Sequence, residues 1–314
     1  MVLKGILVAV GLLVATCTVF VWQAVVLPKD SGSAEQYSFA VTAGENAFQI
    51  AKHLEQAGLI RSRIGFDVYA VVRGIRRDLK AGTYFLSPSM RVEEIAEKIV
   101  AGEDSPLTIR ILEGWRAKDI ARYLQDRGIV EGEDFLLASQ NLEGYLFPDT
   151  YQIASDTSAQ AIVEMMQENF EGKLTAEFYA AVQRQGKTLN DIVIMASMLE
   201  KEVQSKEDKK VVAGILWKRM AQGIPLQVDA TVAYGSTEED ELSQVELQTP
   251  SPYNTYLIQG LPAGPISNPG AESLEAALFP VETAYLYYLS ALNGTTIFSE
   301  TLEEHNIQRV KHLR

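Results

Sequence analysis

The sequence contains one cysteine and three histidines among 314 residues, and this scarcity excludes several kinds of site. Cys17 has no second cysteine to pair with, so neither a disulfide framework nor a cysteine-based metal site can form within one chain. The histidines, His53, His305 and His312, do not form a histidine-rich pattern typical of zinc sites. We therefore expect no metal and no cofactor.

Positive charge is also scarce. The chain has 28 Lys and Arg against 41 Asp and Glu, a formal net charge of −13. Such a balance argues against a nucleic-acid partner, because the phosphate backbone is bound chiefly by Lys and Arg. The remaining composition, 47% hydrophobic and 22% charged, is that of an ordinary globular protein of about two domains.

One long run lacks charge altogether. Residues 5–27 are uncharged and long enough to span a bilayer, with Lys4 before the run and Trp22 near its far end. This arrangement predicts a single-pass anchor at residues 1–28 in the cytoplasmic membrane, with the N-terminus cytoplasmic and the bulk outside, periplasmic in a Gram-negative cell. The alternatives are a cleaved signal peptide and a lipoprotein cleavage site at residues 14–17, both of which fit the long run poorly.

A repeat at a spacing of 70 residues follows a polar linker at residues 29–36. Residues 44–60 match residues 114–130 at six positions, and a shorter copy lies at residues 92–102. Each copy has apolar residues at helical spacing and a glycine where a helix would stop, which predicts an amphipathic helix, preceded by a short strand in the two longer copies. The unit fits a carbohydrate-binding module of the LysM type or an α/β scaffold without a ligand.

Glu200 is the main candidate for chemistry. It ends an almost entirely apolar stretch, residues 191–199, that is predicted to be helical. A carboxylate at the edge of such a helix is costly to ionise, which suits it to general acid catalysis. The alternative is a structural carboxylate that reaches water or pairs with Lys201.

The region after Glu200 combines regular and turn-rich segments. The pattern predicts a helix at residues 206–222, an extended piece at 226–234 and a strand at 285–291. Gln227 and Asp229 would share one face of the extended piece, because side chains in a strand alternate with period two. Further polar and aromatic residues, which suit an ordered active-site loop, gather at residues 251–270.

These segments resemble the YceG-like family of endolytic murein transglycosylases. The resemblance covers essentially the whole chain and rests on several motifs in order, at residues 143–151, 195–202, 226–229, 252–256, 260–270 and 304–306. It implies an α+β fold with an N-terminal transmembrane helix. A small LysM-like α/β unit at residues 37–105 and a mixed α/β catalytic domain at residues 106–314 would follow.

The resemblance also implies a site. It places the catalytic acid on Glu200, and it implies substrate-binding residues at Glu207, Gln227, Asp229, Tyr253, Asn254, Tyr256 and His305. The chain departs from the family pattern at Ala230 and Ala263, where proline is usual. Thr296 stands where a histidine is frequent, which leaves one substrate contact in doubt.

The implied reaction is lytic cleavage of the MurNAc–GlcNAc bond in nascent peptidoglycan. Glu200 would protonate the leaving oxygen and then accept the proton of the C6 hydroxyl, which attacks its own anomeric carbon and leaves a 1,6-anhydro end. An ordinary glycosidase needs two carboxylates, and Glu202 cannot partner Glu200, because positions i and i+2 lie on different helix faces. The implied partners are glycan strands, the membrane and peptidoglycan synthases. Two alternatives stay open: a non-catalytic peptidoglycan-binding scaffold, and a hydrolase that uses Asp229.

Overall fold

The computed structural model describes residues 27–33, 35–102, 106–154, 157–236, 243–291 and 294–312. The described chain divides into two compact units. Unit 1 contains the described residues up to Ile109 together with Tyr123–Glu131 and Tyr151–Ser158. Unit 2 contains Arg110–Arg122, Gly132–Thr150 and the described residues from Ala159 onward.

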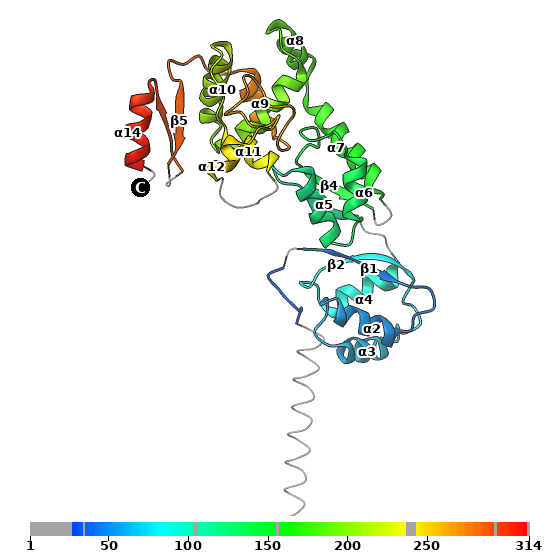
Figure 1. The fold of residues 1–314 in the computed structure, drawn as a ribbon. Coiled ribbons are helices and arrows are strands. Elements are labelled where there is room, and N and C mark those ends of the chain that lie inside the picture. Colours follow the sequence, from blue (N-terminus) through cyan, green and yellow to red (C-terminus); the bar gives the residue numbers. More distant parts are fainter. Residues whose placement is uncertain are drawn as a thin grey trace, which may run out of the picture. The chain divides into compact units, whose positions relative to one another are not determined.

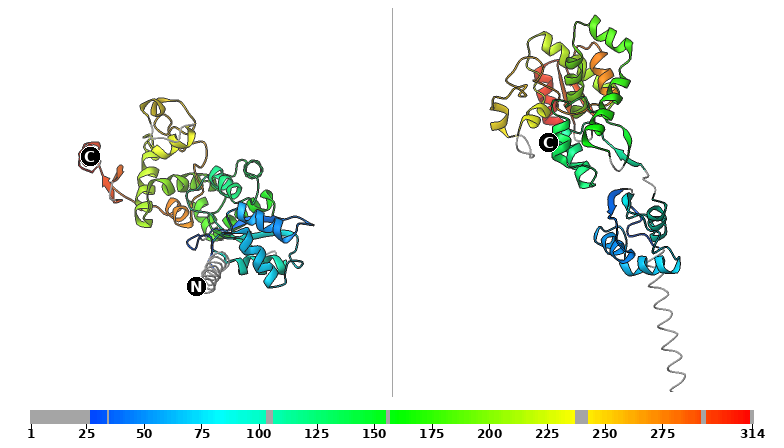
Figure 2. Two further views of the ribbon diagram at one scale, coloured as in Figure 1. Left: turned by 90° about the horizontal axis from the view of Figure 1, so that it is seen from below. Right: turned by 90° about the vertical axis from the view of Figure 1, so that its right-hand side faces the viewer.

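Unit 1 is built on an antiparallel pair of strands covered by helices. Its first elements in chain order are β1 (Tyr37–Val41), α2 (Ala47–Gln56), α3 (Arg63–Val72), β2 (Gly82–Leu86) and α4 (Val92–Ala101). Tyr37 of β1 lies opposite Leu86 of β2. Ile50 and Leu54 of α2 are fully buried, so the apolar face predicted for this repeat copy packs into the core of the unit. The views in Figures 1 and 2 show the blue and cyan helices gathered on these strands.

The helices predicted from the repeat are confirmed. Helices α2 and α5 (Ala117–Asp126) occupy matching positions of the two longer copies, and α4 forms on the shorter one. Gly58, Gly102 and Gly128 follow these helices with φ angles of 72°, 69° and 64°. Glycine is favoured there because a left-handed backbone carries no Cβ penalty for it. After α4, β3 (Leu107–Arg110) pairs with β4 (Thr150–Ile153) in a second two-stranded sheet.

Unit 2 is organised around helix α9 (Leu189–Glu202), which is buried at every position from Ile192 to Leu199. Thr188 caps its start and shares a reciprocal capping box with Asp191. Four helices pack against it: α8 (Ala176–Arg184), α10 (Lys206–Ala221), α11 (Asp229–Gly235) and α13 (Ala271–Leu278). A helix enclosed in this way has no solvent face, so its sequence is apolar all round.

The C-terminal part of unit 2 is a hairpin with one helix. β5 (Tyr287–Ser290) and β6 (Thr296–Ser299) are antiparallel, and α14 (Leu302–His312) packs beside them. They are the orange and red elements of Figure 1. The strand predicted at residues 285–291 is therefore confirmed. The other helices of the unit are α6 (Gly132–Ala138), α7 (Ala159–Lys173) and α12 (Gln244–Gln248).

The predicted fold class is wrong. The transmembrane helix expected at residues 5–27 lies outside the described residues, and within the described ranges no helix combines the length and the apolar character needed to cross a membrane. Helix α10, the longest of them, has 16 residues and several charges, whereas a span needs about 20 apolar residues. The described fold is a mixed α/β arrangement of helices with two-stranded sheets.

The extended piece predicted at residues 226–234 is also wrong, because residues from Asp229 onward form helix α11. The alternation that suggested a strand ends at Gln227, where a φ angle of 56° turns the chain into the helix. Gln227 and Asp229 nevertheless meet in one cavity.

Two helical glycines give opposite expectations for alanine. A Cβ at Gly214 in α10 would lie 2.1 Å from the carbonyl oxygen of Val281, whereas a Cβ at Gly172 in α7 would meet nothing within 4 Å. Gly214→Ala should lower the free energy of unfolding by about 1–3 kcal/mol through overpacking. Gly172→Ala should raise it by about 0.5–1 kcal/mol. Urea denaturation checks both, and a stabilised Gly214→Ala variant would contradict this packing of α10.

Candidate active site

A cavity of about 500 Å³ beside the C-terminal end of α9 is the candidate active site. Four residues predicted from the sequence meet in it, and Glu202, which was not predicted, joins them. We call it the acid cavity, and its lining residues are Glu202, Arg219, Gln227, Asp229, Tyr256, Tyr287, Tyr288, Leu289, Ser290, Leu302, His305 and Arg309.

The acid cavity is assembled from the ends of several elements. Glu202 is the last residue of α9, and Asp229 is the first residue of α11. Gln227 has a left-handed backbone, which is uncommon for a residue other than glycine. Its backbone N–H donates to the Thr255 carbonyl over 3.0 Å, and its Oε1 accepts from Arg219 Nη2 over 2.5 Å. These contacts fix a strained residue at the site, where such strain is commonly found.

Glu202 is the carboxyl group best suited to hold a proton. Tyr288 donates a hydrogen bond to its Oε2 over 3.0 Å. Burial raises the pKa of Glu202 to about 7; the nearby Asp229 also raises it, and the Tyr288 bond lowers it. The residue lies deep among protein atoms but lines the acid cavity, so a ligand there can reach it. A carboxyl group in this setting can act as a general acid at neutral pH.

The second carboxylate, Asp229, accepts a hydrogen bond from the Tyr256 hydroxyl. Burial, followed by this bond, raises the pKa of Tyr256, so Tyr256 remains a donor at neutral pH. Asp229 is thereby held as an acceptor on the same cavity wall as Glu202. The cavity thus holds one carboxyl group with a raised pKa and a second one that accepts a tyrosine hydrogen bond, and two carboxyl groups in different environments can divide acid and base roles.

Two arginines, Arg219 and Arg309, and the imidazole of His305 also line the acid cavity. Arg219 is buried, lies 5.6 Å from the centre of the Tyr287 ring, and its Nε has no hydrogen-bond partner in the described part of the chain. His305 stacks on the same ring at 5.4 Å. Burial lowers the pKa of His305, and the charges of Arg309 and Arg219 lower it further, so His305 is neutral at pH 7. Both side chains can hydrogen-bond a polar ligand.

Glu200 lies elsewhere. Its Oε1 pairs with Lys209 Nζ at 2.9 Å, and its Oε2 accepts from the backbone N–H of Gly270 and the hydroxyl of Ser273 over 2.9 and 2.7 Å. Only 8% of the Glu200 side chain and 4% of the Lys209 side chain are exposed. The pair joins α9 to α10 and to the start of α13, and Glu200 is not among the residues that line the acid cavity.

Three other predicted residues also lie outside the acid cavity lining. Asn254 is fully buried, and its Nδ2 donates to the carbonyls of Glu246, Leu247 and Thr249, so it shapes the loop that carries Tyr256. Tyr253 lines a different cavity of unit 2. Glu207 is exposed in the first turn of α10.

The sequence reasoning missed Glu202, Arg219 and Tyr288. From the sequence there was no reason to prefer Glu202 over Glu200 as the acid, because α9 is apolar on all sides. The spacing of its apolar residues therefore does not indicate which side faces a cavity. Arg219 could have been noticed from the sequence. It follows the apolar Ile215 by four residues, so a cation is predicted on the apolar face of the helix. Within the described ranges, no group of three or more His, Cys, Asp or Glu side chains is placed to hold a metal ion.

Comparison with known proteins adds independent information. The model of the YceG-like family matches residues 39–311. The chain is 30% identical to an endolytic murein transglycosylase of Bacillus subtilis, over 91% of this chain and 87% of that protein. It is 27% identical to an endolytic murein transglycosylase of Streptococcus pneumoniae serotype 2, over 91% of this chain and 60% of that longer protein.

A solved structure is similar as well. The crystal structure of a YceG-like protein from Listeria monocytogenes superimposes with a TM-score of 0.61 at 31% sequence identity. The superposition covers 88% of this chain and the whole of that chain.

The Glu200–Lys209 pair makes a prediction about stability. Glu200→Gln leaves Lys209 buried without its counter-charge and should lower the free energy of unfolding by about 3–5 kcal/mol. Replacing both residues by methionine removes both charges and should recover part of this loss. Chemical denaturation measures both effects. An unchanged midpoint for Glu200→Gln would show that the pair does not hold these helices together.

Glu202 makes a prediction about pH. Its pKa is about 7 in the folded chain against an ordinary 4.5, so the folded state keeps a proton that the unfolded state releases. The resulting stability is complete below pH 4.5 and is lost as pH rises through about 7. Glu202→Gln mimics the protonated form and should be more stable than the natural chain at pH 8.5, by about 2–3 kcal/mol. At pH 5 the two should nearly coincide. An equal difference at both pH values would contradict the raised pKa.

Proposed function

We propose a function from the premise that the chain belongs to the YceG-like family: it is a peptidoglycan lytic transglycosylase, a lyase that acts on the cell-wall side. It cleaves the MurNAc–GlcNAc bond within glycan strands and leaves 1,6-anhydro-N-acetylmuramyl ends. The main structural observation that supports this function is the acid cavity. Residues of three family-like motifs line it together with Glu202, a carboxyl group whose pKa is raised to about 7.

Glu202, and not the predicted Glu200, is the proposed catalytic acid. Glu202 opens on the acid cavity, whereas Glu200 is occupied by Lys209 and by the start of α13. Glu143 is another carboxyl group whose pKa burial raises to about 7. Both of its oxygens, however, accept hydrogen bonds from backbone or side-chain donors of other segments, which makes it a structural link.

The reaction then needs only one carboxyl group as acid and base. Glu202 donates its proton to the glycosidic oxygen as the bond between that oxygen and the anomeric carbon breaks. The C6 hydroxyl of the same muramyl sugar attacks the anomeric carbon, and its proton passes to the Glu202 carboxylate. The carboxyl group of Glu202 is thereby protonated again, and no water enters the products. Asp229, kept in place by Tyr256, stabilises the positive charge that develops on the sugar ring.

The other polar residues of the acid cavity orient the glycan. Arg219 lines the cavity and holds the Gln227 amide in place. Neutral His305, stacked on Tyr287, can hydrogen-bond a sugar hydroxyl. Tyr287, which contacts both His305 and Arg219, lines the same cavity. This combination of aromatic and planar polar side chains supports a carbohydrate ligand.

Unit 1 has a proposed supporting role. Its order β1, α2, α3, β2 is the strand–helix–helix–strand order expected of a LysM-like module, which supports an additional grip on glycan strands. An association with peptidoglycan synthases stays a prediction.

Product masses test the reaction. Digestion of purified glycan strands by the chain should give fragments with 1,6-anhydro ends, each lighter by one water than the corresponding hydrolysis product. Asp229→Asn should slow cleavage by about 10²–10³-fold, because a stabilising charge is lost, while the ends that still form remain 1,6-anhydro. Mass spectrometry of the fragments measures both.

The same digest separates the two glycosidic mechanisms. Both Glu202 and Asp229 line one cavity, which is the observation that favours a hydrolase with two carboxylates as the second candidate. Reducing muramyl ends from the natural chain would establish hydrolysis and exclude the lytic reaction.

A further inference from the structure

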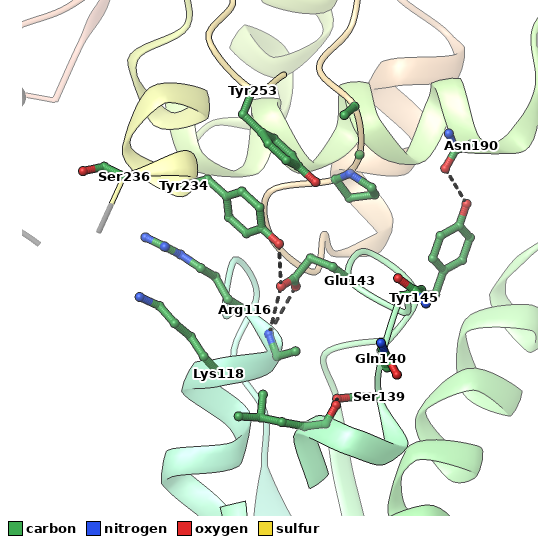
Figure 3. Close-up of a pocket in the computed structure, with 16 residues that line it drawn as sticks. Arg116, Lys118, Ser139, Gln140, Glu143, Tyr145, Asn190, Tyr234, Ser236 and Tyr253 are labelled. Atoms are coloured by element: carbon green, nitrogen blue, oxygen red, sulfur yellow. Dashed lines mark hydrogen bonds between the residues drawn. The ribbon is translucent and has the colours of Figure 1, made fainter. Parts of the chain in front are cut away.

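A second cavity in unit 2 is larger than the acid cavity and has different walls. It encloses about 700 Å³. Its walls come from the start of α5, the turn after α6, the start of α9, the end of α11 and the loop at residues 263–265. We call it the Arg116 pocket, and Figure 3 shows its side chains. None of the proposed catalytic steps uses it.

The charged side chains of the Arg116 pocket come from the start of α5 and from the turn after α6. Among the described residues that line it, Arg116 and Lys118 are cations and Glu143 is a carboxylate. Figure 3 shows the Arg116 and Lys118 side chains extending side by side from the start of α5. Glu143 faces Tyr234, Ala117 and Asn268 and accepts hydrogen bonds from all three. Both oxygens of Glu143 are therefore engaged by donors of other segments of the chain.

Arg116 is positioned to bind an anion. Its guanidinium lies 5.5 Å from the centre of the Tyr234 ring, an arrangement that fixes the planar group against the wall. Among the contacts of the described residues, no carboxylate forms an ion pair with Arg116. A guanidinium held in this way presents parallel N–H groups that match a carboxylate.

The rest of the Arg116 pocket suits a peptide. Hydroxyl and amide groups from Ser139, Gln140, Asn141 and Asn190 line it, and they can donate to and accept from peptide groups. Tyr145, whose hydroxyl donates to Asn190 over 3.0 Å, and Tyr253 add aromatic surface. A short polar chain with a carboxylate group would satisfy both Arg116 and these neutral groups.

The Arg116 pocket is within reach of the acid cavity. Helix α11 connects them, because its first residue, Asp229, lines the acid cavity and Tyr234 lines the Arg116 pocket. Five residues of helix span about 7.5 Å. Helix α9 also runs between them, from Asn190 to Glu202, which corresponds to about 18 Å. An extended peptide of about five residues spans about 17 Å, so it can cover such distances.

We propose that the Arg116 pocket binds the carboxylates of the peptide stem that the muramyl sugar carries, while the glycan itself occupies the acid cavity. This inference rests on the proposed function, since it needs peptidoglycan as the substrate. It makes Arg116 a determinant of a preference for peptide-bearing strands over naked strands. Arg116 acts on substrate binding, at a distance from the bond that breaks.

Binding of a free stem peptide tests the proposal without any cleavage. The probe is the tetrapeptide L-Ala-γ-D-Glu-L-Lys-D-Ala, and its counterpart is the same peptide with both carboxylates amidated. NMR titration with the full chain should show the carboxylate form binding at least about tenfold more tightly than the amidated form. Arg116→Gln should weaken binding of the carboxylate form by a similar factor, and Arg184→Gln, an exposed cation at the end of α8, should not.

A second measurement is the ratio of kcat/KM on peptide-bearing strands to kcat/KM on strands stripped of peptides by an amidase. The Arg116→Gln variant should lower this ratio at least about fivefold, and Arg184→Gln should preserve it. Equal binding of the two peptides, undetectable binding of both, or an unchanged ratio in Arg116→Gln would overturn the proposal. These failures differ from failure of the proposed function, which would appear as missing 1,6-anhydro ends in the digest of the natural chain.

Discussion

The burial of helix α9 is the constraint on which the rest of unit 2 depends. The helix has no solvent face over eight consecutive positions, from Ile192 to Leu199, so its two terminal carboxylates must both find places within the protein. Two residues apart, they point in directions about 200° apart. Glu200 enters an ion pair that joins three helices, and Glu202 enters the acid cavity. The Glu200 ion pair thus holds together the helices that bury Glu202, and this burial raises the pKa of Glu202 to about 7.

The acid cavity is completed by segments that are irregular in sequence but ordered by hydrogen bonds. Buried Asn254 donates hydrogen bonds to three carbonyls of the preceding segment. Thr255 accepts hydrogen bonds from the backbone N–H groups of Gln227 and Val228. These bonds place Tyr256 against Asp229. The polar loop therefore behaves as part of the core, which explains how a turn-rich stretch can position catalytic groups.

Local patterns predicted much of the fold. The repeat helices and the strand at residues 285–291 are confirmed, because each depends on neighbouring residues. The direction of a carboxylate at the end of a buried helix depends on distant partners such as Lys209 and Tyr288, which no local pattern reveals. The motifs identified the end of α9 and selected Glu200 there, whereas the acid that we propose from the cavity is Glu202. Helix α11 was not predicted for a related reason. The left-handed backbone of Gln227 ends the strand-like alternation of side chains, and the sequence pattern does not reveal it.

The most direct test compares the two carboxylates of α9 in one cleavage assay. Glu200→Gln and Glu202→Gln would each be incubated with glycan strands well below their unfolding temperatures, and 1,6-anhydro ends would be counted by mass spectrometry. The account predicts no ends above background from Glu202→Gln and measurable ends from the folded Glu200→Gln chain. Cleavage by Glu202→Gln together with a folded but inactive Glu200→Gln would contradict it, and would return the acid to Glu200.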